Sequence, residues 1–496
     1  MKDIIIAIDE GTTNCKAIAL DLTGQVLAIE SLPLSISTPN PGWVEQDGMQ
    51  LINATFTVLK KCIEHVDINR IAGIGISNQR ETSIGWYRSS SMPIAPAMTW
   101  QCSRSADFCQ SLIENGKEDL IKTTTGLPVA ALFAGSKMRW LLDNVPGARE
   151  KAENNEICLG TIDSWLLFNL TNGQSFYCDF SNASRTQLLN LQTASWDETM
   201  LEIYGIPKQV LPEIKPSSYR FGETKNIPGV PDGIPILSMV GDSHAALYGH
   251  CLGKDGFVKT TYGTGSSVMA PISHPDCSIK ELATTVAWHD SNCITYGIEG
   301  NIPHTGDALL WMSQVTNVDH FDNKNDYINN IASQAPDNLG VYFVPMLTGA
   351  GAPWWNVNAR GVIYGLSRGV TTAHLIRAAL ESICYQIADV IECMKKSKVF
   401  KLERLMVDGG PTKNDWLMQF QADLLGCKVS RSSTAELSAI GAALLAFKCA
   451  LGLDNNELEK LIPEHFIFIP NMERHIQLQK CKSQWDRAVK NTLQNC

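Results

Sequence analysis

The stretch that decides the fold is Ile4-Ile5-Ile6-Ala7-Ile8-Asp9-Glu10-Gly11-Thr12-Thr13-Asn14, at the start of the chain. Its first five residues are apolar and mostly β-branched, as in a buried strand, and its last four have the composition of a tight turn. Residues 16–22 are apolar again, and residues 26–29 repeat the pattern after a second turn. The sequence therefore predicts three consecutive strands joined by turns, with polar side chains at the first turn.

That first turn contains residue types that suit a phosphate and a metal ion. Its backbone N–H groups can point at a phosphate, and Thr12, Thr13 and Asn14 add side-chain donors. The ammonium of Lys16 can reach a phosphate, and Asp9 can hold Mg²⁺ through water. Taken alone, the same residues would also suit an ordinary hairpin turn.

A similar hairpin recurs in the second half of the chain. The apolar residues 257–261 lead into Tyr262-Gly263-Thr264-Gly265-Ser266, and residues 268–270 are apolar again. Each hairpin is followed later by a predicted helix and then by a strand that ends in a polar loop. In the first half these are residues 49–65 and 71–76, and in the second half residues 371–394 and 404–407, before Asp408-Gly409-Gly410.

This duplication predicts two similar α/β domains whose phosphate-binding turns face a shared cleft, with a hinge near residues 241–256. A length of 496 residues also favours at least two domains. Neither a Walker A motif nor a Rossmann fingerprint is present, which disfavours those nucleotide-binding folds.

Composition limits the partners and the compartment. The net charge of −10 argues against non-specific nucleic-acid binding, which needs a basic surface. No apolar segment approaches the ~20 residues that span a bilayer, so no membrane association is expected. The N-terminus lacks a signal-peptide pattern, and the 15 cysteines form no Cys-x-x-Cys pair, which favours reduced thiols. We therefore expect a cytoplasmic protein.

Four further residues predict an alcohol as the second substrate. Arg80-Glu81, at the end of a predicted strand, offers donors and an acceptor that suit vicinal hydroxyls, and Trp100 can cover a carbon skeleton. Asp242 follows the apolar residues 236–240 and can accept an alcohol proton during phosphoryl transfer. His244 is a rival base, but a histidine that enters a helix is more often structural.

These residues belong to longer motifs that extend over nearly the whole chain and that resemble the FGGY carbohydrate kinases, above all the glycerol kinase branch. The motifs are Asp9 to Thr13, Pro41-Gly42-Trp43-Val44-Glu45-Gln46-Asp47, Ser77 to Thr82, Trp100-Gln101-Cys102, Ser181-Asn182-Ala183-Ser184-Arg185-Thr186, Tyr262 to Gly265, Gly349 to Pro353, Gly361 to Gly369, Glu381-Ser382 and Val407 to Gly410. The resemblance implies two actin-like (ribonuclease H-like) domains that close around ATP-Mg²⁺ and a sugar. These would be residues 1–248, which bind the sugar, and residues 249–496, which bind the nucleotide.

The resemblance also implies roles for single residues. Asp242 would be the catalytic base, Arg80 and Glu81 would bind substrate hydroxyls, and Trp100 would lie against the carbons. Asp9 would bind the Mg²⁺ ion through water. Nucleotide contacts would come from Thr12, Thr13, Asn14, Lys16, Thr264, Gly306, Gly410 and Asn414. The resemblance leaves the oligomeric state open between a homodimer and a homotetramer.

Departures from the glycerol kinase pattern gather around the substrate. Leu132 stands where that branch has a Tyr that donates to glycerol, Ser267 where it has a Phe that lines the pocket, and Ser243 where it has a Gln. At the nucleotide, Lys16 replaces an Arg and Leu310 a Gln. The Tyr hydrogen bond is worth about 0.5–1.5 kcal/mol and the buried ring roughly 1.5–3 kcal/mol, so glycerol would bind on the order of 100-fold more weakly.

Two hypotheses about the substrate follow, and one about a different class of protein. Because Arg80, Glu81, Trp100 and Asp242 are retained, glycerol kinase-like activity comes first, with a tetritol, pentitol or ketose as the alternative. An actin- or Hsp70-like ATPase switch would share the fold but would have no use for these side chains, and a pseudokinase is disfavoured by Asp9 and Asp242. Dependence of ATP hydrolysis on an added polyol separates these classes.

Overall fold

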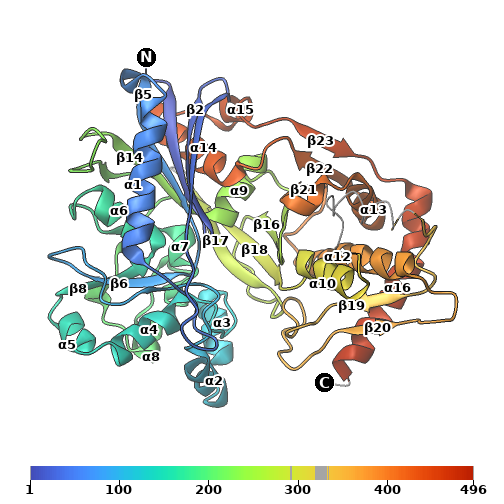
Figure 1. Cartoon of the computed structure of the whole chain (residues 1–496). Coiled ribbons are helices and arrows are strands. Elements are labelled where there is room, and N and C mark those ends of the chain that lie inside the picture. The colour runs from blue at the N-terminus through green and yellow to red at the C-terminus, as the bar shows by residue number, and fades with distance from the viewer. Residues whose placement is uncertain (1, 291–292, 319–331, 333, 495–496) are drawn as a thin grey trace.

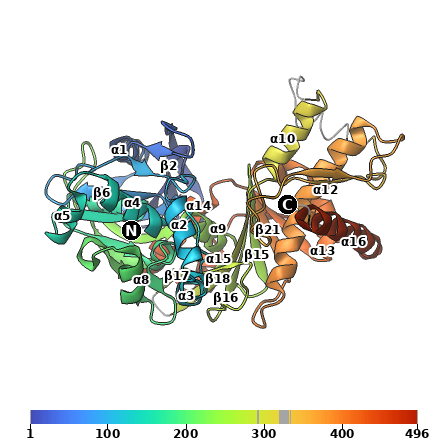
Figure 2. The ribbon, with the colours of Figure 1, turned by 90° about the horizontal axis from the view of Figure 1, so that it is seen from below.

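The computed structural model describes residues 2–290, 293–318, 332 and 334–494. Figure 1 shows two bodies side by side, one built from the first half of the chain (blue to green) and one from the second half (yellow to red). Figure 2, turned by 90°, shows the same two bodies separated by the central strands and helices. Each body is organised around one large sheet.

The first large sheet has the strand order β13-β14-β5-β1-β2-β3. β1 (Ile4–Glu10), β2 (Asn14–Asp21) and β3 (Val26–Pro33) are antiparallel neighbours, which confirms the three predicted strands. β5 (Ile71–Asn78) and β14 (Pro235–Gly241) run parallel to β1, and β13 (Ser218–Glu223) forms the edge. Helix α1 (Gly48–Glu64) packs on this sheet and is capped by Asp47, whose carboxylate accepts from the backbone N–H of Met49.

The second large sheet repeats this arrangement. Its order is β17-β18-β16-β15-β21-β22-β23, in which β15 (Phe257–Tyr262), β16 (Ser266–Ile272) and β18 (Ile294–Ile302) are antiparallel neighbours. β21 (Arg404–Asp408) and β22 (Lys428–Ser432) run parallel to β15. The edges are β17 (Ala283–His289) and β23 (His465–Phe468). Six strands of the second sheet match the first sheet in order and direction and β17 is additional, so the predicted duplication is confirmed.

The remaining strands and helices lie outside the two large sheets. The first half adds a small sheet of β4 (Glu45–Gln46), β7 (Ala97–Met98), β6 (Ser83–Tyr87) and β8 (Ile157–Thr161), and the pairs β9 (Tyr177–Asp179) with β12 (Glu213–Lys215) and β10 (Leu189–Asn190) with β11 (Ser195–Trp196). Its helices are α2 (Ala106–Glu114), α3 (Glu118–Thr125), α4 (Ala134–Asn144), α5 (Ala148–Glu153), α6 (Ile162–Leu170), α7 (Phe180–Ala183) and α8 (Glu198–Tyr204). The second half adds α10 (Gly306–Val315), β19 (Tyr342–Val344), β20 (Val362–Tyr364) and α15 (Asn455–Glu459).

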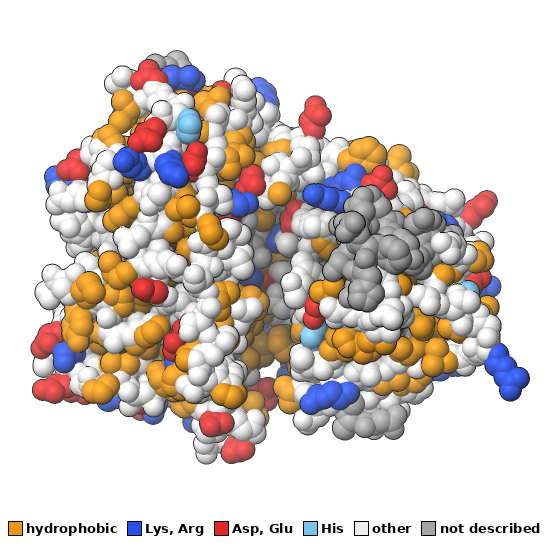
Figure 3. All heavy atoms as spheres, in the orientation of Figure 1, with side chains coloured by type: hydrophobic (Ala, Val, Ile, Leu, Met, Phe, Trp, Pro, Cys, Tyr) orange, Lys and Arg blue, Asp and Glu red, His pale blue; other side chains and the backbone are white. Residues whose placement is uncertain are grey.

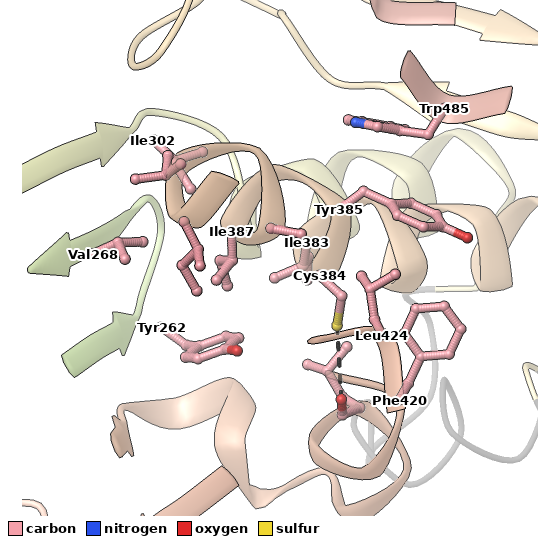
Figure 4. Packing of buried hydrophobic residues seen from close by; sticks show 14 of the residues in the cluster. Tyr262, Val268, Ile302, Ile383, Cys384, Tyr385, Ile387, Phe420, Leu424 and Trp485 are labelled. Atoms are coloured by element: carbon pink, nitrogen blue, oxygen red, sulfur yellow. Dashed lines mark hydrogen bonds between the residues drawn. The ribbon is translucent and has the colours of Figure 1, made fainter. Parts of the chain in front are cut away.

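Aromatic side chains hold the helices of the second half together. Tyr385 lies on α12 (Thr372–Met394), whose bounds match the predicted helix. Its ring stacks on Trp485 of α16 (Met472–Gln494), with centroids 5.3 Å apart, and meets the edge of Phe420 of α13 (Asp415–Leu425) at 5.9 Å. Figure 4 shows these rings around α12, with Cys384 between them and the strands. Buried ring pairs of this kind fix helices at defined distances.

Two helices cross between the large sheets. α9 (Asp242–Cys251) follows β14 directly, and α14 (Leu437–Leu451) comes from the far end of the chain. α14 packs on the first sheet, where the Ser238 hydroxyl donates to the carbonyl of Ala442 at 2.7 Å. This return of the chain was not predicted from the sequence.

Figure 3 shows the surface deeply hollowed between the two bodies, where the ends of the central strands lie. Of the helices in the described part of the chain, none has both the length and the apolar character needed to cross a bilayer.

Candidate active site

Three parallel strands of the first sheet bring the predicted acidic and basic residues together. β1 ends at Asp9 and Glu10, β5 runs into Arg80, and β14 ends just before Asp242. The register pairs Asp9 with Ser77 and Ser77 with Val240, so the carboxyl ends of the three strands lie side by side at one end of the sheet. Open α/β sheets bind ligands at the carboxyl ends of their parallel strands.

Asp9 and Glu10 are the last two residues of β1, so their carboxylates point to opposite faces of the sheet. The Ser77 hydroxyl donates to Oδ1 of Asp9 at 2.9 Å, and burial raises the pKa of Asp9 to about 6, to which the charge of Asp242 contributes. Burial also raises the pKa of Glu10 to about 8, although the Gln79 side chain donates to it at 3.1 Å. Mg²⁺ takes carboxylate oxygens, and the Asp9 carboxylate feels the negative charge of Asp242, which a cation would offset, so the residues present fit the ion.

Asp242 opens α9 beside a guanidinium. Its Oδ1 lies 3.2 Å from Nε of Arg80 and accepts the backbone N–H of Ser243 at 2.6 Å. Burial raises the pKa of Asp242, and the charge of Arg80 counteracts part of that rise. His244 is fully buried, and burial lowers its pKa well below the ordinary value, so this imidazole is neutral. Asp242 contacts the predicted site residue Arg80, whereas His244 lies 3.5 Å from the hydroxyl of Thr285, so Asp242 is the better placed of the two candidate bases.

Arg80 and Glu81 are connected through two residues that the sequence reading missed. Glu299 of β18 accepts from Nη2 of Arg80 at 2.9 Å and forms an ion pair with Nη1 of Arg185 at 2.8 Å. Nε of Arg185 donates to Glu81 at 2.5 Å. Arg185 lies in the Ser181 to Thr186 motif, and the local signal for Glu299 is that it is the one charged residue of β18.

The other predicted substrate residues lie around this cluster. The indole of Trp100, 39 % exposed, donates to the hydroxyl of Thr12 at 3.0 Å, which connects the expected acceptor and nucleotide regions. The Ser267 hydroxyl donates to Glu299 at 2.9 Å, and the Ser243 hydroxyl lies 3.4 Å from Nζ of the buried Lys259. Leu132 is partly buried against an apolar cluster of Leu127, Phe133 and Ala283.

The glycine-bearing loops expected at the nucleotide contact one another closely. A Cβ at Gly306 would lie 2.4 Å from the carbonyl oxygen of Gly263, and one at Gly409 would lie 2.0 Å from that of Tyr262. Gly409 also has φ +97°, a conformation that other residues rarely adopt. The carbonyl of Thr264 accepts the N–H groups of Thr305 and Asp307, so this turn is fixed to the start of α10.

The remaining expected nucleotide residues have different surroundings. Around Gly410, a Cβ would meet no atom within 4 Å, so this side of the loop is open. Asn414 caps α13 with its side-chain oxygen. Lys16 forms an ion pair with Glu436 at 3.0 Å, and Asn14 donates to the neighbouring hydroxyl of Thr13 at 3.2 Å. Lys16 would have to exchange this partner in order to reach a phosphate.

Two ribonuclease H-like bodies, with glycine-bearing loops on the second sheet and clustered charged side chains at the strand ends of the first, have the arrangement expected of an ATP-dependent phosphotransferase. The models of the FGGY family of carbohydrate kinases match residues 4–249 with the N-terminal domain and residues 258–450 with the C-terminal domain. The chain belongs to this family and phosphorylates an alcohol group of a polyol or sugar. An actin- or Hsp70-like switch is thereby excluded as its class.

Named relatives cover the whole chain. The apulose kinase of Pectobacterium atrosepticum is 42 % identical over 98 % of this chain and 97 % of its own length. The glycerol kinase of Pseudothermotoga lettingae is also 42 % identical, over 99 % and 98 %. The crystal structure of Plasmodium falciparum glycerol kinase with ADP superposes with a TM-score of 0.90 at 30 % identity and covers 99 % of this chain and 98 % of that one.

Proposed function

We propose that this kinase transfers the γ-phosphoryl group of ATP to a primary hydroxyl of a four- or five-carbon polyol or ketose. The observation that carries this proposal is Ser267, whose small side chain is bound to Glu299 where the glycerol kinase pattern has a Phe. Leu132 likewise replaces a Tyr and packs on apolar neighbours. A pocket without these two rings has room for carbons beyond the third.

In the proposed mechanism Asp242 accepts the proton of the attacking hydroxyl. Arg80 and Glu81 bind neighbouring hydroxyls as donor and acceptor, and Trp100 lies against the carbon chain. Asp9 would hold Mg²⁺ through water, and the ion supplies charge neutralisation on the phosphates when bound.

The phosphates would be bound by the turn at Thr12 to Asn14 and, on the opposite side, by the backbone near Thr264 and Gly410. Gly306 leaves space for this second turn, since any side chain at that position would meet Gly263. Lys16 and Asn414 complete the proposed nucleotide contacts. We assign the acceptor to residues 1–248 and the nucleotide to residues 249–496, a division supported by the two family-model matches.

The relatives support both substrate classes. An apulose kinase and a glycerol kinase are equally identical to this chain, so overall similarity does not separate a larger sugar from glycerol. Glycerol is the second candidate, because Arg80, Glu81, Trp100 and Asp242 are all present.

A substrate panel tests the proposal. The value of kcat/KM should be higher for at least one four- or five-carbon polyol or ketose, including apulose, than for glycerol. In the variant Leu132→Tyr/Ser267→Phe the preference should move toward glycerol, since the longer substrate would meet the new ring. The double variant is the informative one because substitutions in the same pocket can couple. If glycerol is the best substrate of the unmodified protein, the larger-substrate proposal is wrong.

A further inference from the structure

An unbroken row of charges connects the proposed base to the proposed hydroxyl-binding carboxylate. In order along this row, the residues are Asp242, Arg80, Glu299, Arg185 and Glu81. The successive nitrogen–oxygen distances are 3.2, 2.9, 2.8 and 2.5 Å. Signs alternate from one member to the next, so every contact is attractive.

The middle of the row is inaccessible to solvent. The side chains of Glu299 and Arg185 are 0 % exposed, and the ring of Phe133 lies over the Arg185 guanidinium at 5.1 Å. Ionised groups are costly to bury, and the alternating signs offset part of that cost. Nη1 and Nη2 of Arg185 and Oε2 of Glu299 have no hydrogen bond within the described residues, so the attraction along this part of the row is ionic. The two guanidinium groups hold the pKa of Glu299 well below its usual range, so its carboxylate is ionised.

Arg80 and Glu81, the two members of the row assigned to substrate hydroxyls, carry signs of a ligand. Nη1 of Arg80 is buried and has no hydrogen-bond partner within the described residues, so a donor there can be satisfied by a substrate oxygen. Glu81 has φ +61°, an uncommon conformation for a residue other than glycine, and Arg185 holds its carboxylate. Two cations and three anions leave one negative charge, which suits a neutral ligand rich in hydroxyl donors.

Glu299 reaches this row from the second half of the chain. It lies on β18, as its hydrogen-bonded neighbour Ser267 lies on β16, whereas the other four charged residues belong to the first half. The register places Ser267 opposite Asn301 and Glu299 opposite Met269, so the two strands present both side chains to one face of the sheet. The acceptor site is thus completed by a strand of the other body.

We infer that Glu299 and Arg185 are positioning residues that hold Arg80 and Glu81 at a fixed distance from Asp242, with Ser267 as the third donor to Glu299. This inference rests on the proposed function, because it assigns Arg80, Glu81 and Asp242 to the acceptor. It adds that acceptor affinity depends on two residues that do not reach the substrate.

The test compares Glu299→Gln with Glu381→Gln, measured with whichever acceptor the protein phosphorylates best. Glu299→Gln keeps size and one acceptor oxygen but removes the charge between the two guanidinium groups. The KM for the acceptor should rise and kcat/KM should fall by about 30- to 1,000-fold, while the Kd of ADP stays within about 3-fold. Glu381 is the matched control, since it is a buried partner of Arg377 at 2.9 Å on α12. Its variant should lose a similar amount of thermal stability without a change in acceptor KM.

A milder variant keeps the test valid if Glu299→Gln does not fold. Ser267→Ala removes one of three donors to Glu299 and should raise the acceptor KM by about 2- to 10-fold. Arg185→Lys, which keeps the charge but not the forked geometry, should retain more activity than Arg185→Met. The inference is wrong if folded Glu299→Gln or Ser267→Ala keeps the wild-type acceptor KM. The proposed function fails separately, if the unmodified protein prefers glycerol over every larger acceptor in the panel.

Discussion

At the scale of single residues, the proposed chemistry depends on how Asp242 is held. Burial disfavours its charged form, whereas the guanidinium of Arg80, 3.2 Å away, favours it. The result is a carboxyl group whose pKa is raised but which has a cation beside it to stabilise the ionised form. Such a group can take up the proton of an alcohol as the oxygen attacks and can release it after transfer.

The variant Asp242→Asn should therefore lower kcat by about 10²–10⁴ and leave the Kd of ADP nearly unchanged. Because Asp242 must be ionised to act as a base, activity falls as pH decreases through its pKa. Since burial raises that pKa, the acidic limb of the kcat/KM profile should lie above the ordinary aspartate pKa of about 3.9. The exposed Asp255, replaced by Asn, is the control and should keep wild-type kinetics. An Asp242→Asn enzyme with more than about a tenth of wild-type turnover would remove Asp242 from this role.

At the scale of elements, the two sheets are joined across the contact between α9 and α14. A Cβ at Gly441 would lie 1.8 Å from the carbonyl oxygen of Ala245, and one at Gly249 would lie 2.6 Å from that of Leu437. Both obstacles are backbone atoms, which cannot rotate away. The helices can approach this closely only because both positions are glycine.

We expect Gly441→Ala to destabilise the protein by about 1–3 kcal/mol, although alanine is the better helix former by about 1 kcal/mol. Thermal denaturation should show a lower Tm, and acceptor turnover should fall because Asp242 lies at the start of α9. Gly297→Ala on β18 is the matched control, because its Cβ would meet only ordinary contacts from 3.5 Å outward. A Gly441→Ala protein at least as stable as the wild type would contradict this account of the crossing.

At the scale of the whole molecule, the proposed reaction needs groups from both bodies. The acceptor would lie against the first body, the nucleotide against the second, and the groove seen in Figure 3 separates them. α9 and α14 are the helices between the bodies, and α14 packs on the first sheet. A rotation about these two helices would narrow the groove, which would exclude water from the phosphoryl group.

Small-angle scattering should record this closure as a smaller radius of gyration when ATP and acceptor are both bound. The slow variant Asp242→Asn allows both substrates to be present without turnover, and each substrate alone serves as the control. Contraction requires both bodies to be bridged, so the pair should have a larger effect than either ligand. An unchanged radius of gyration, with binding of both ligands verified by calorimetry, would count against a closing groove.

Much of the fold was determined by local sequence. Residues 4–8, 71–76 and 257–261 are strands within a residue or two of their predicted ends, because short β-branched runs bounded by turn residues have few alternatives. Arg80 and Asp242 could be predicted as site residues for a similar reason, since a polar residue just after a buried strand lies at the end of the sheet, where ligands can reach it.

Contacts between distant residues could be read only from the folded chain. Glu299 contacts Arg80 and Arg185 from more than 100 residues away, and no local pattern specifies the partner of a buried charge. In the same way, α14 packs on a sheet formed more than 150 residues earlier, and its sequence shows only that it is a buried helix. Hydrophobic periodicity encodes the direction of a side chain within its own element, whereas the pairing of charges and of helix surfaces is fixed only when the whole chain has folded.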